Sequence, residues 1–238
     1  MKVLAVDTAT EACSAALYVE GEIKEEFQLA PQQHTQLILK MVDTLLQQAD
    51  LKVTDLDALA FGRGPGSFTG VRIATGVVQG LAFAADLPVV PVSTLASMAQ
   101  YTYQQHQHEK VLSGIDARMG GMYWGCYQPG ENGLMQLVGK EQVSPPEAVV
   151  LADKEQWVGA GSAWGSYTEQ LSEGLSTAIT HQYPEYLPHS STIAELAAYA
   201  HSQGQSVPAA QAQPVYLRDD VAKKSKSIGP QINANKRK

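Results

Sequence analysis

Cysteine and charge are both scarce in this 238-residue sequence. Only Cys13 and Cys126 are present, which excludes a disulfide-stapled secreted scaffold and indicates a reducing compartment inside the cell. Charged residues make up 17% and apolar residues 44%, so a disordered chain and a charge-rich coiled coil are excluded. We therefore expect a folded protein with a sizeable core.

Long apolar runs are also missing. The run at 3–6 ends at Asp7, short of the roughly 7–15 apolar residues of a signal peptide. The most apolar stretch, 71–92, is interrupted by Arg72, Gln79 and Asp86, whereas a membrane span needs about 20 residues almost free of charge. The sequence therefore predicts a cytoplasmic protein.

Charge of one sign dominates most of the chain. The net charge of −7 argues against a freestanding nucleic-acid binder, because phosphate neutralisation needs an excess of Lys and Arg. Six basic residues and no acidic ones follow Ala222, so residues 1–222 alone carry −13. We expect 223–238 to be a basic, disordered tail on an acidic body.

The order of apolar patterns predicts an α/β fold with mixed sheets flanked by helices. Strands are expected at 2–7, 13–19, 22–29, 58–61, 89–92, 111–116 and 122–127, and helices at 33–49, 68–85, 94–104, near 145–152 and at 190–202. A polar stretch at 104–110 separates two halves that begin alike. We expect an N-terminal lobe at 1–104 and a smaller C-terminal lobe at 105–222.

Two loops have the composition of anion-binding loops. One is D-T-A-T at 7–10, and the other is the glycine-rich segment 62–70 between a strand and a helix. The candidate phosphate or nucleotide residues are Asp7, Thr8, Thr10, Gly64, Gly66 and Ser67. A bland interpretation stays open for both loops: the first satisfies a tight turn, and the glycines of the second permit sharp turning and close packing.

Standard catalytic and metal motifs are absent. The glycine-rich segment lacks the Gly-Lys-Ser/Thr of a Walker loop, and neither G-x-S-x-G nor H-E-x-x-H occurs. None of the six histidines pair four residues apart on one expected helix, and His106 and His108 fall in the polar stretch. We expect no metal site and no hydrolase chemistry through these motifs.

Two helices carry more apolar surface than one sheet face requires. On the helix at 33–49 the apolar arc covers roughly 200°, against about 100° for an ordinary sheet-covering helix. On the helix at 68–85, Gly76 and Gly80 leave a groove for a second helix. The expected partner interface is Ile38, Met41, Val42, Leu45, Leu46, Ile73, Gly76, Val77 and Gly80. The alternative is that both helices pack only on each other and on the sheet.

Several motifs together resemble the TsaB family. They are V-L-A-V-D-T-A-T-E-A-C-S-A-A-L from residue 3, H-T-Q at 34–36, G-R-G-P-G-S-F-T-G-V-R-I from residue 62, I-D-A-R at 115–118, M-Y-W at 122–124 and Y-L-R at 216–218. The resemblance implies an actin-like ATPase fold of two related lobes, the second reduced. It also implies a non-catalytic subunit in the formation of threonylcarbamoyladenosine in tRNAs that read ANN codons.

The resemblance implies partners as well. These are the transferase subunit TsaD and the ATPase TsaE, with tRNA approached through the complex and ATP held at a shared interface rather than by this chain alone. The apolar surface of the helices at 33–49 and 68–85 further predicts self-pairing when the chain is alone. Where the transferase subunit has two metal-binding histidines, this chain has Thr94 and Met98, and Ala9 replaces a glycine usual in phosphotransferases of this fold. Both departures disfavour metal and ATP binding.

Two other functions remain as alternatives. An independent ATP-dependent phosphotransferase would use Asp7, Thr8, Thr10 and the glycine-rich loop, but no general base can be named for it. A metallopeptidase, a label given to the wider family, is disfavoured by Thr94 and Met98.

Overall fold

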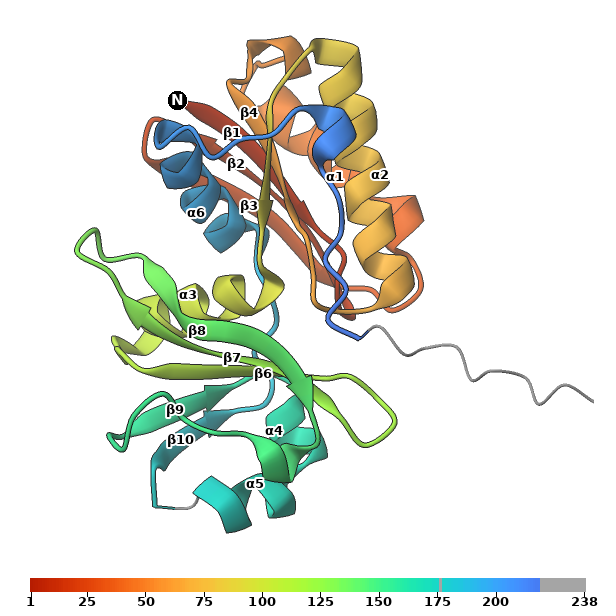
Figure 1. Cartoon of the computed structure of the whole chain (residues 1–238). Helices are drawn as coiled ribbons and strands as arrows, with labels where there is room; N and C mark the ends of the chain where they lie inside the picture. The colour runs from red at the N-terminus through yellow and green to blue at the C-terminus, as the bar shows by residue number, and fades with distance from the viewer. Residues whose placement is uncertain (176, 219–238) are drawn as a thin grey trace, which may run out of the picture.

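The computed structural model describes residues 1–175 and 177–218. The expected tail at 223–238 lies outside the described residues. The described chain forms two five-stranded mixed sheets with helices around them (Figure 1). The expected α/β architecture of two related lobes is therefore confirmed.

The first sheet has the strand order β3-β2-β1-β4-β5. Its strands are β1 (Lys2–Asp7), β2 (Ala12–Val19), β3 (Glu22–Leu29), β4 (Ala58–Gly62) and β5 (Val89–Val92). Strands β1, β2 and β3 form an antiparallel meander, and β4 and β5 continue the sheet in parallel to β1. Central strands β1 and β4 are buried on both faces, which explains their continuous apolar sequences.

Helices cover both faces of the first sheet. Helix α1 (His34–Gln48) and helix α2 (Phe68–Ala85) lie on one face with the short turn η1 (Val53–Asp55), and α6 (Ser190–Ser202) lies on the other (Figure 1). Apolar side chains of α1 and α2 meet those of β1, β2 and β4 in one core, and α6 closes a second core on the opposite face.

The second sheet repeats the first topology with the order β10-β9-β6-β7-β8. Its strands are β6 (Val111–Asp116), β7 (Met122–Pro129), β8 (Met135–Ser144), β9 (Trp157–Ala160) and β10 (Ile179–Tyr183). Again three antiparallel strands are extended by two parallel ones. Helix α3 (Thr94–His106) covers one face and the short helices α4 (Ala163–Ser166) and α5 (Thr168–Leu175) the other.

The prediction of a helix near 145–152 is wrong. Only the turn η2 (Pro146–Ala148) forms there, and the sequence also missed strands β8, β9 and β10. Pro145 and Pro146 remove two backbone N–H donors at this point, which disfavours a longer helix.

After β10 the chain returns to the first sheet. Helix α6 contacts β1 and β2, and the turn η3 (Ala209–Gln211) contacts α2. Ser14 Oγ lies 2.8 Å from Ser190 Oγ, which ties the start of α6 to β2. The sequence-based division placed all of 105–222 in the second lobe, but these contacts join 190–211 to the first sheet, whose second face α6 covers.

Candidate functional site

The two loops with anion-binding composition lie against each other. Thr8 Oγ1 donates a hydrogen bond of 2.6 Å to the carbonyl oxygen of Gly70, and the backbone N–H of Ser67 donates one of 2.7 Å to Ala9 O. The Ser67 side chain accepts from Gly70 N at the N-terminus of α2. The polar groups expected to face a phosphate are thus largely paired with one another.

The glycines of the second loop allow this close contact. A methyl group added at Gly66 would lie 2.5 Å from Ala9 O, and one at Gly70 would collide with Thr8 O. Gly64 has a φ of +95°, which side-chain-bearing residues rarely adopt. The geometry therefore fits the close-packing interpretation of these glycines. Thr10 stands at the edge of the loop and accepts from Ala12 N.

Asp7 is sealed beneath the same contact. Its Oδ1 accepts from Ala9 N at 3.0 Å, and its Oδ2 has no partner among the described residues. Burial raises the pKa of Asp7 to about 7, although the Ala9 N–H and the nearby His189 oppose the rise. A side chain at Gly62 would collide with Oδ2. Asp7 is thus enclosed by its own protein rather than open to a phosphate.

The expected partner residues of α1 are buried within the first lobe. Their side chains fill the core of the first lobe, where α1 packs on β2 and beside α2: Ile38, Met41, Val42, Leu45 and Leu46. Because the helix is flanked by both a sheet and a second helix, its wide apolar arc is used internally. On α1 the large apolar side chain left exposed is Leu39.

The expected partner residues of α2 are more exposed than those of α1. Gly76 and Gly80 are exposed, and a side chain at either would meet nothing within 4 Å, while Ile73 and Val77 are half-buried. Phe83, which the sequence analysis did not single out, continues this line and is 87% exposed. Phe83 follows Gly80 by three residues and Gly76 by seven, and this spacing could have placed it on the same helix face from the sequence alone. Together Ile73, Gly76, Val77, Gly80 and Phe83 form an outward line that we call the α2 stripe.

Helix α2 is more apolar than its packing on the first sheet requires. Within the described ranges, α2 is the one helix long and apolar enough to cross a membrane by length and composition. It packs on the first sheet through Ala74, Val78 and Ala82, as a core helix does. Its remaining apolar surface is therefore in excess of what the first lobe covers.

A polar cluster missed by the sequence analysis joins the two lobes. The Glu141 carboxylate of β8 accepts from Tyr127 Oη at 2.7 Å and from Ser93 Oγ, and Arg63 Nη2 lies 3.4 Å from it. Burial and the Glu141 charge raise the pKa of Tyr127 well above its usual value. A single acid in a strand that the sequence did not predict gives no signal for such a role.

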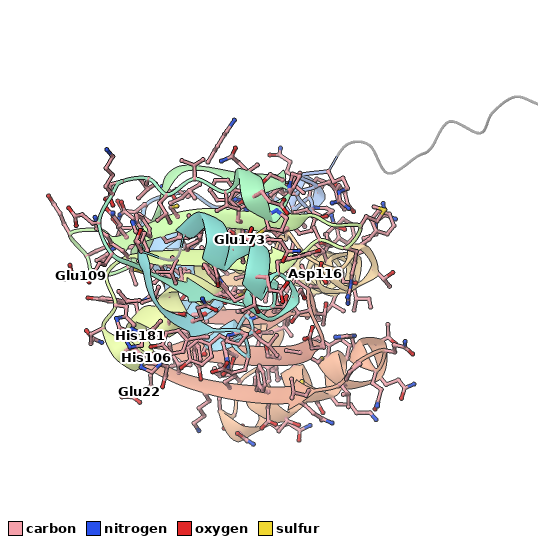
Figure 2. The ribbon with its side chains drawn as sticks, turned by 90° about the horizontal axis from the view of Figure 1, so that it is seen from below. Glu22, His106, Glu109, Asp116, Glu173 and His181 are labelled. Atoms are coloured by element: carbon pink, nitrogen blue, oxygen red, sulfur yellow. The ribbon has the colours of Figure 1, made fainter. Side chains whose placement is uncertain are left out.

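Histidines form an aromatic row instead of a metal site. The His106 ring stacks on Tyr183 at 4.4 Å, and the His189 ring stacks on Tyr101 at 4.0 Å. His106 and His181 lie on one side of the molecule in Figure 2, away from Asp116. No group of three or more His, Cys, Asp or Glu residues with metal-binding geometry occurs among residues 1–175 and 177–218. Thr94 and Met98 are buried on α3.

Comparison with known proteins identifies relatives across most of the chain. The family model "TsaD: tRNA N6-adenosine threonylcarbamoyltransferase" matches residues 28–227. The "tRNA threonylcarbamoyladenosine biosynthesis protein TsaB" of Escherichia coli is 43% identical over 93% of this chain and 96% of its own. The protein of the same name from Haemophilus influenzae is 39% identical over 93% and 95%.

A solved structure is similar to this chain in both sequence and fold. The crystal structure of a Pseudomonas aeruginosa protein described as having "similarity to peptidase YEAZ" is 47% identical and has a TM-score of 0.86. The match covers 91% of this chain and 99% of that one.

Proposed function

The chain belongs to the TsaB family of tRNA threonylcarbamoyladenosine biosynthesis proteins, with the actin-like two-lobed fold, and from this premise we propose that it acts as a non-catalytic subunit. Its task in this proposal is to hold a TsaD-type transferase in working form, with the α2 stripe as the contact surface. The tRNAs modified are those that read ANN codons.

The α2 stripe is the observation that carries the proposal. Phe83 is 87% exposed, and Gly76 and Gly80 present bare helix backbone beside it. A large exposed apolar line of this kind marks a protein interface, and bare glycines let a second helix approach closely. A stable partner contact would bury about 1,000 Å² or more in total. In this proposal the same contact also lets two copies of the chain pair in a pure sample.

The absence of a catalytic role is supported by the closed loops. Thr8, Ser67 and Gly70 bond to each other, and Asp7 is enclosed, so the arrangement needed by a phosphotransferase is not formed. Thr94 and Met98, at the positions of the transferase's metal histidines, are core residues without ligand capacity of the needed kind. The phosphotransferase and metallopeptidase alternatives therefore gain no support.

The remaining partners follow from the same premise. A TsaE-type ATPase joins the pair, ATP lies at an interface shared with the partners, and tRNA reaches this chain within the complex, in the cytoplasm. These assignments extend the family membership to the assembly in which the chain works.

A reconstituted transfer assay tests the proposal. Threonylcarbamoyl transfer to an unmodified ANN-decoding tRNA is measured with the transferase and the ATPase, with and without the full-length chain. We expect transfer to depend on the chain. Transfer that proceeds equally well without it would overturn the proposed function.

The contact surface is tested separately by Phe83→Asp. We expect this variant to remain folded and to lose both pairing in size-exclusion chromatography and transfer activity. The matched control is Val150→Asp, since Val150 is also a strongly exposed apolar residue but lies in the second lobe. Equal pairing by the two variants would remove the α2 stripe from the interface.

A further inference from the structure

Arginine side chains gather at one place in this acidic chain. Residues 1–222 carry a formal charge of −13, yet the four arginines of the described ranges all lie near the segment 215–218. They are Arg63, Arg72, Arg118 and Arg218. This clustering is unlike the lysines, which are spread over both lobes.

Hydrogen bonds from the last described segment draw these residues together. Val215 N–H donates to Arg63 O at 2.8 Å, and Arg72 Nε donates to Tyr216 Oη at 2.8 Å. Arg218 Nη1 then donates to Ala117 O at 2.9 Å, in the turn between β6 and β7. The segment therefore crosses from α2 of the first lobe to the second sheet, along the side of the molecule where the described chain ends (Figure 1).

The positive groups face outward and their acidic partners face inward. The Arg118 side chain is 86% exposed, while the carboxylate of its ion-pair partner Asp116 is 13% exposed. Arg63 is 30% exposed and its partner Glu141 only 6%. Among the described residues, Arg72 and Arg218 form no ion pair. Among the residues that the structure describes, these ion pairs therefore expose their positive more than their negative groups.

Flat and apolar side chains lie among these arginines. The Arg72 guanidinium lies 3.7 Å from the centre of the Phe68 ring, and Phe68 and Tyr216 are both exposed. Arg118 and Met119, in the turn between β6 and β7, both have positive φ values, of +61° and +54°. Met119 is strongly exposed. Guanidinium groups next to aromatic rings are the features with which proteins hold nucleic-acid backbones and unstacked bases.

We propose that this surface, made of Phe68, Arg72, Arg118, Met119, Tyr216 and Arg218, binds the phosphodiester backbone of the tRNA that is being modified. The inference rests on the proposed function, which supplies the RNA, and adds a direct contact by this chain. An open, extended surface with separated charges suits a polyanion rather than a single small anion. After Asp219 and Asp220 the sequence continues with six more basic residues.

Binding of an unmodified ANN-decoding tRNA transcript tests the surface. Affinity is measured between 50 and 200 mM salt for the full-length chain alone and for its pair with the transferase. We expect Arg118→Gln and Arg72→Gln each to weaken binding about three- to tenfold at low salt and to lower the log–log salt slope by about 0.7–0.9. Arg118 is the safer variant for folding because its side chain is almost fully exposed.

Lys24→Gln is the matched control, since it also removes one exposed positive charge. Lys24 lies on β3, two residues from Glu22, which Figure 2 shows on the side of His106 and opposite Asp116. We expect this control to keep the wild-type slope. Equal slopes for the wild type and both arginine variants, or an equal loss with Lys24→Gln, would overturn the proposal.

Pairing and transfer activity separate this proposal from the proposed function. Arginine variants that lose pairing with the transferase would assign the surface to protein contact and overturn the RNA contact. Transfer that is the same with and without the wild-type chain would overturn the proposed function. The salt slopes of tRNA binding, measured on the chain alone, still decide the RNA contact in that case.

Discussion

Thr8 Oγ1 donates a hydrogen bond of 2.6 Å to the carbonyl oxygen of Gly70, although 62 residues separate them in the sequence. Each residue belongs to a loop whose composition suggests anion binding. The bond uses the hydroxyl that a phosphate would have met and brings the Gly70 backbone against Thr8. A pair of loops that could form a ligand cradle is therefore a packed junction between β1 and α2.

Gly70→Ala tests that junction. The added methyl group would collide with Thr8 O, so we expect the free energy of unfolding to fall by about 1–3 kcal/mol. Gly76→Ala is the matched control in the same helix, because its methyl group meets nothing within 4 Å. The control should gain about 0.5–1 kcal/mol from helix propensity. Urea unfolding that shifts both variants in the same direction would contradict the close packing.

Asp7 should make stability depend on pH. Its pKa is about 7 in the folded protein, against about 3.9 in an unfolded chain, so the folded state binds more protons between these values. The contribution of Asp7 to stability is therefore present below pH 4 and is lost as the pH rises through 7. Unfolding measured from pH 4 to 8 should show a loss of about 2–4 kcal/mol from this group.

Asp7→Asn removes the titrating group and should flatten that profile. The exposed Asp50→Asn serves as a control and should keep the wild-type profile. A profile for Asp7→Asn as steep as that of the wild type would show that other groups cause the pH dependence.

Ile38 and Leu39 are neighbours on α1 with opposite environments. Ile38 is 1% exposed and Leu39 is 53% exposed. Ile38→Ala should lower the free energy of unfolding by about 2–5 kcal/mol because it leaves a cavity. Leu39→Ala should change it by less than about 0.5 kcal/mol. Equal effects in thermal or urea unfolding would mean that Ile38 does not belong to the core.

Gly80→Leu should separate folding from pairing. The new side chain points into open space, so the isolated chain should unfold at the same denaturant concentration or a higher one. Pairing with the transferase should weaken at least tenfold, since the side chain fills the space where a second helix would pack. Titration calorimetry gives the affinity. An isolated variant that fails to fold would show instead that Gly80 faces its own core.

Local patterns were sufficient for most of the fold. Strands β1 to β7 and helices α1, α2, α3 and α6 lie within two residues of their predicted bounds, because each has a clear apolar period or a clear glycine or proline boundary. Strand β8 was missed since its apolar and polar residues do not alternate regularly, and its pairing with β7 holds it in place. Such a strand is defined by its neighbour rather than by its own sequence.

The sequence by itself determined the α/β class, the similar start of the two halves and the motifs of the family, since these follow from local apolar periods and from residues at fixed spacing. The repeated strand order of the second sheet came only with the structure, which shows β8, β9 and β10. Only the tertiary structure decided which apolar and polar groups remain exposed and able to contact a partner or a ligand. Ile38 and Phe83 are both apolar helix residues, but one fills the core and the other faces solvent. Thr8 and Asp7 carry groups suited to a ligand, yet contacts with residues more than 50 positions away enclose them. Burial depends on what the rest of the chain brings alongside, and no local pattern contains that information.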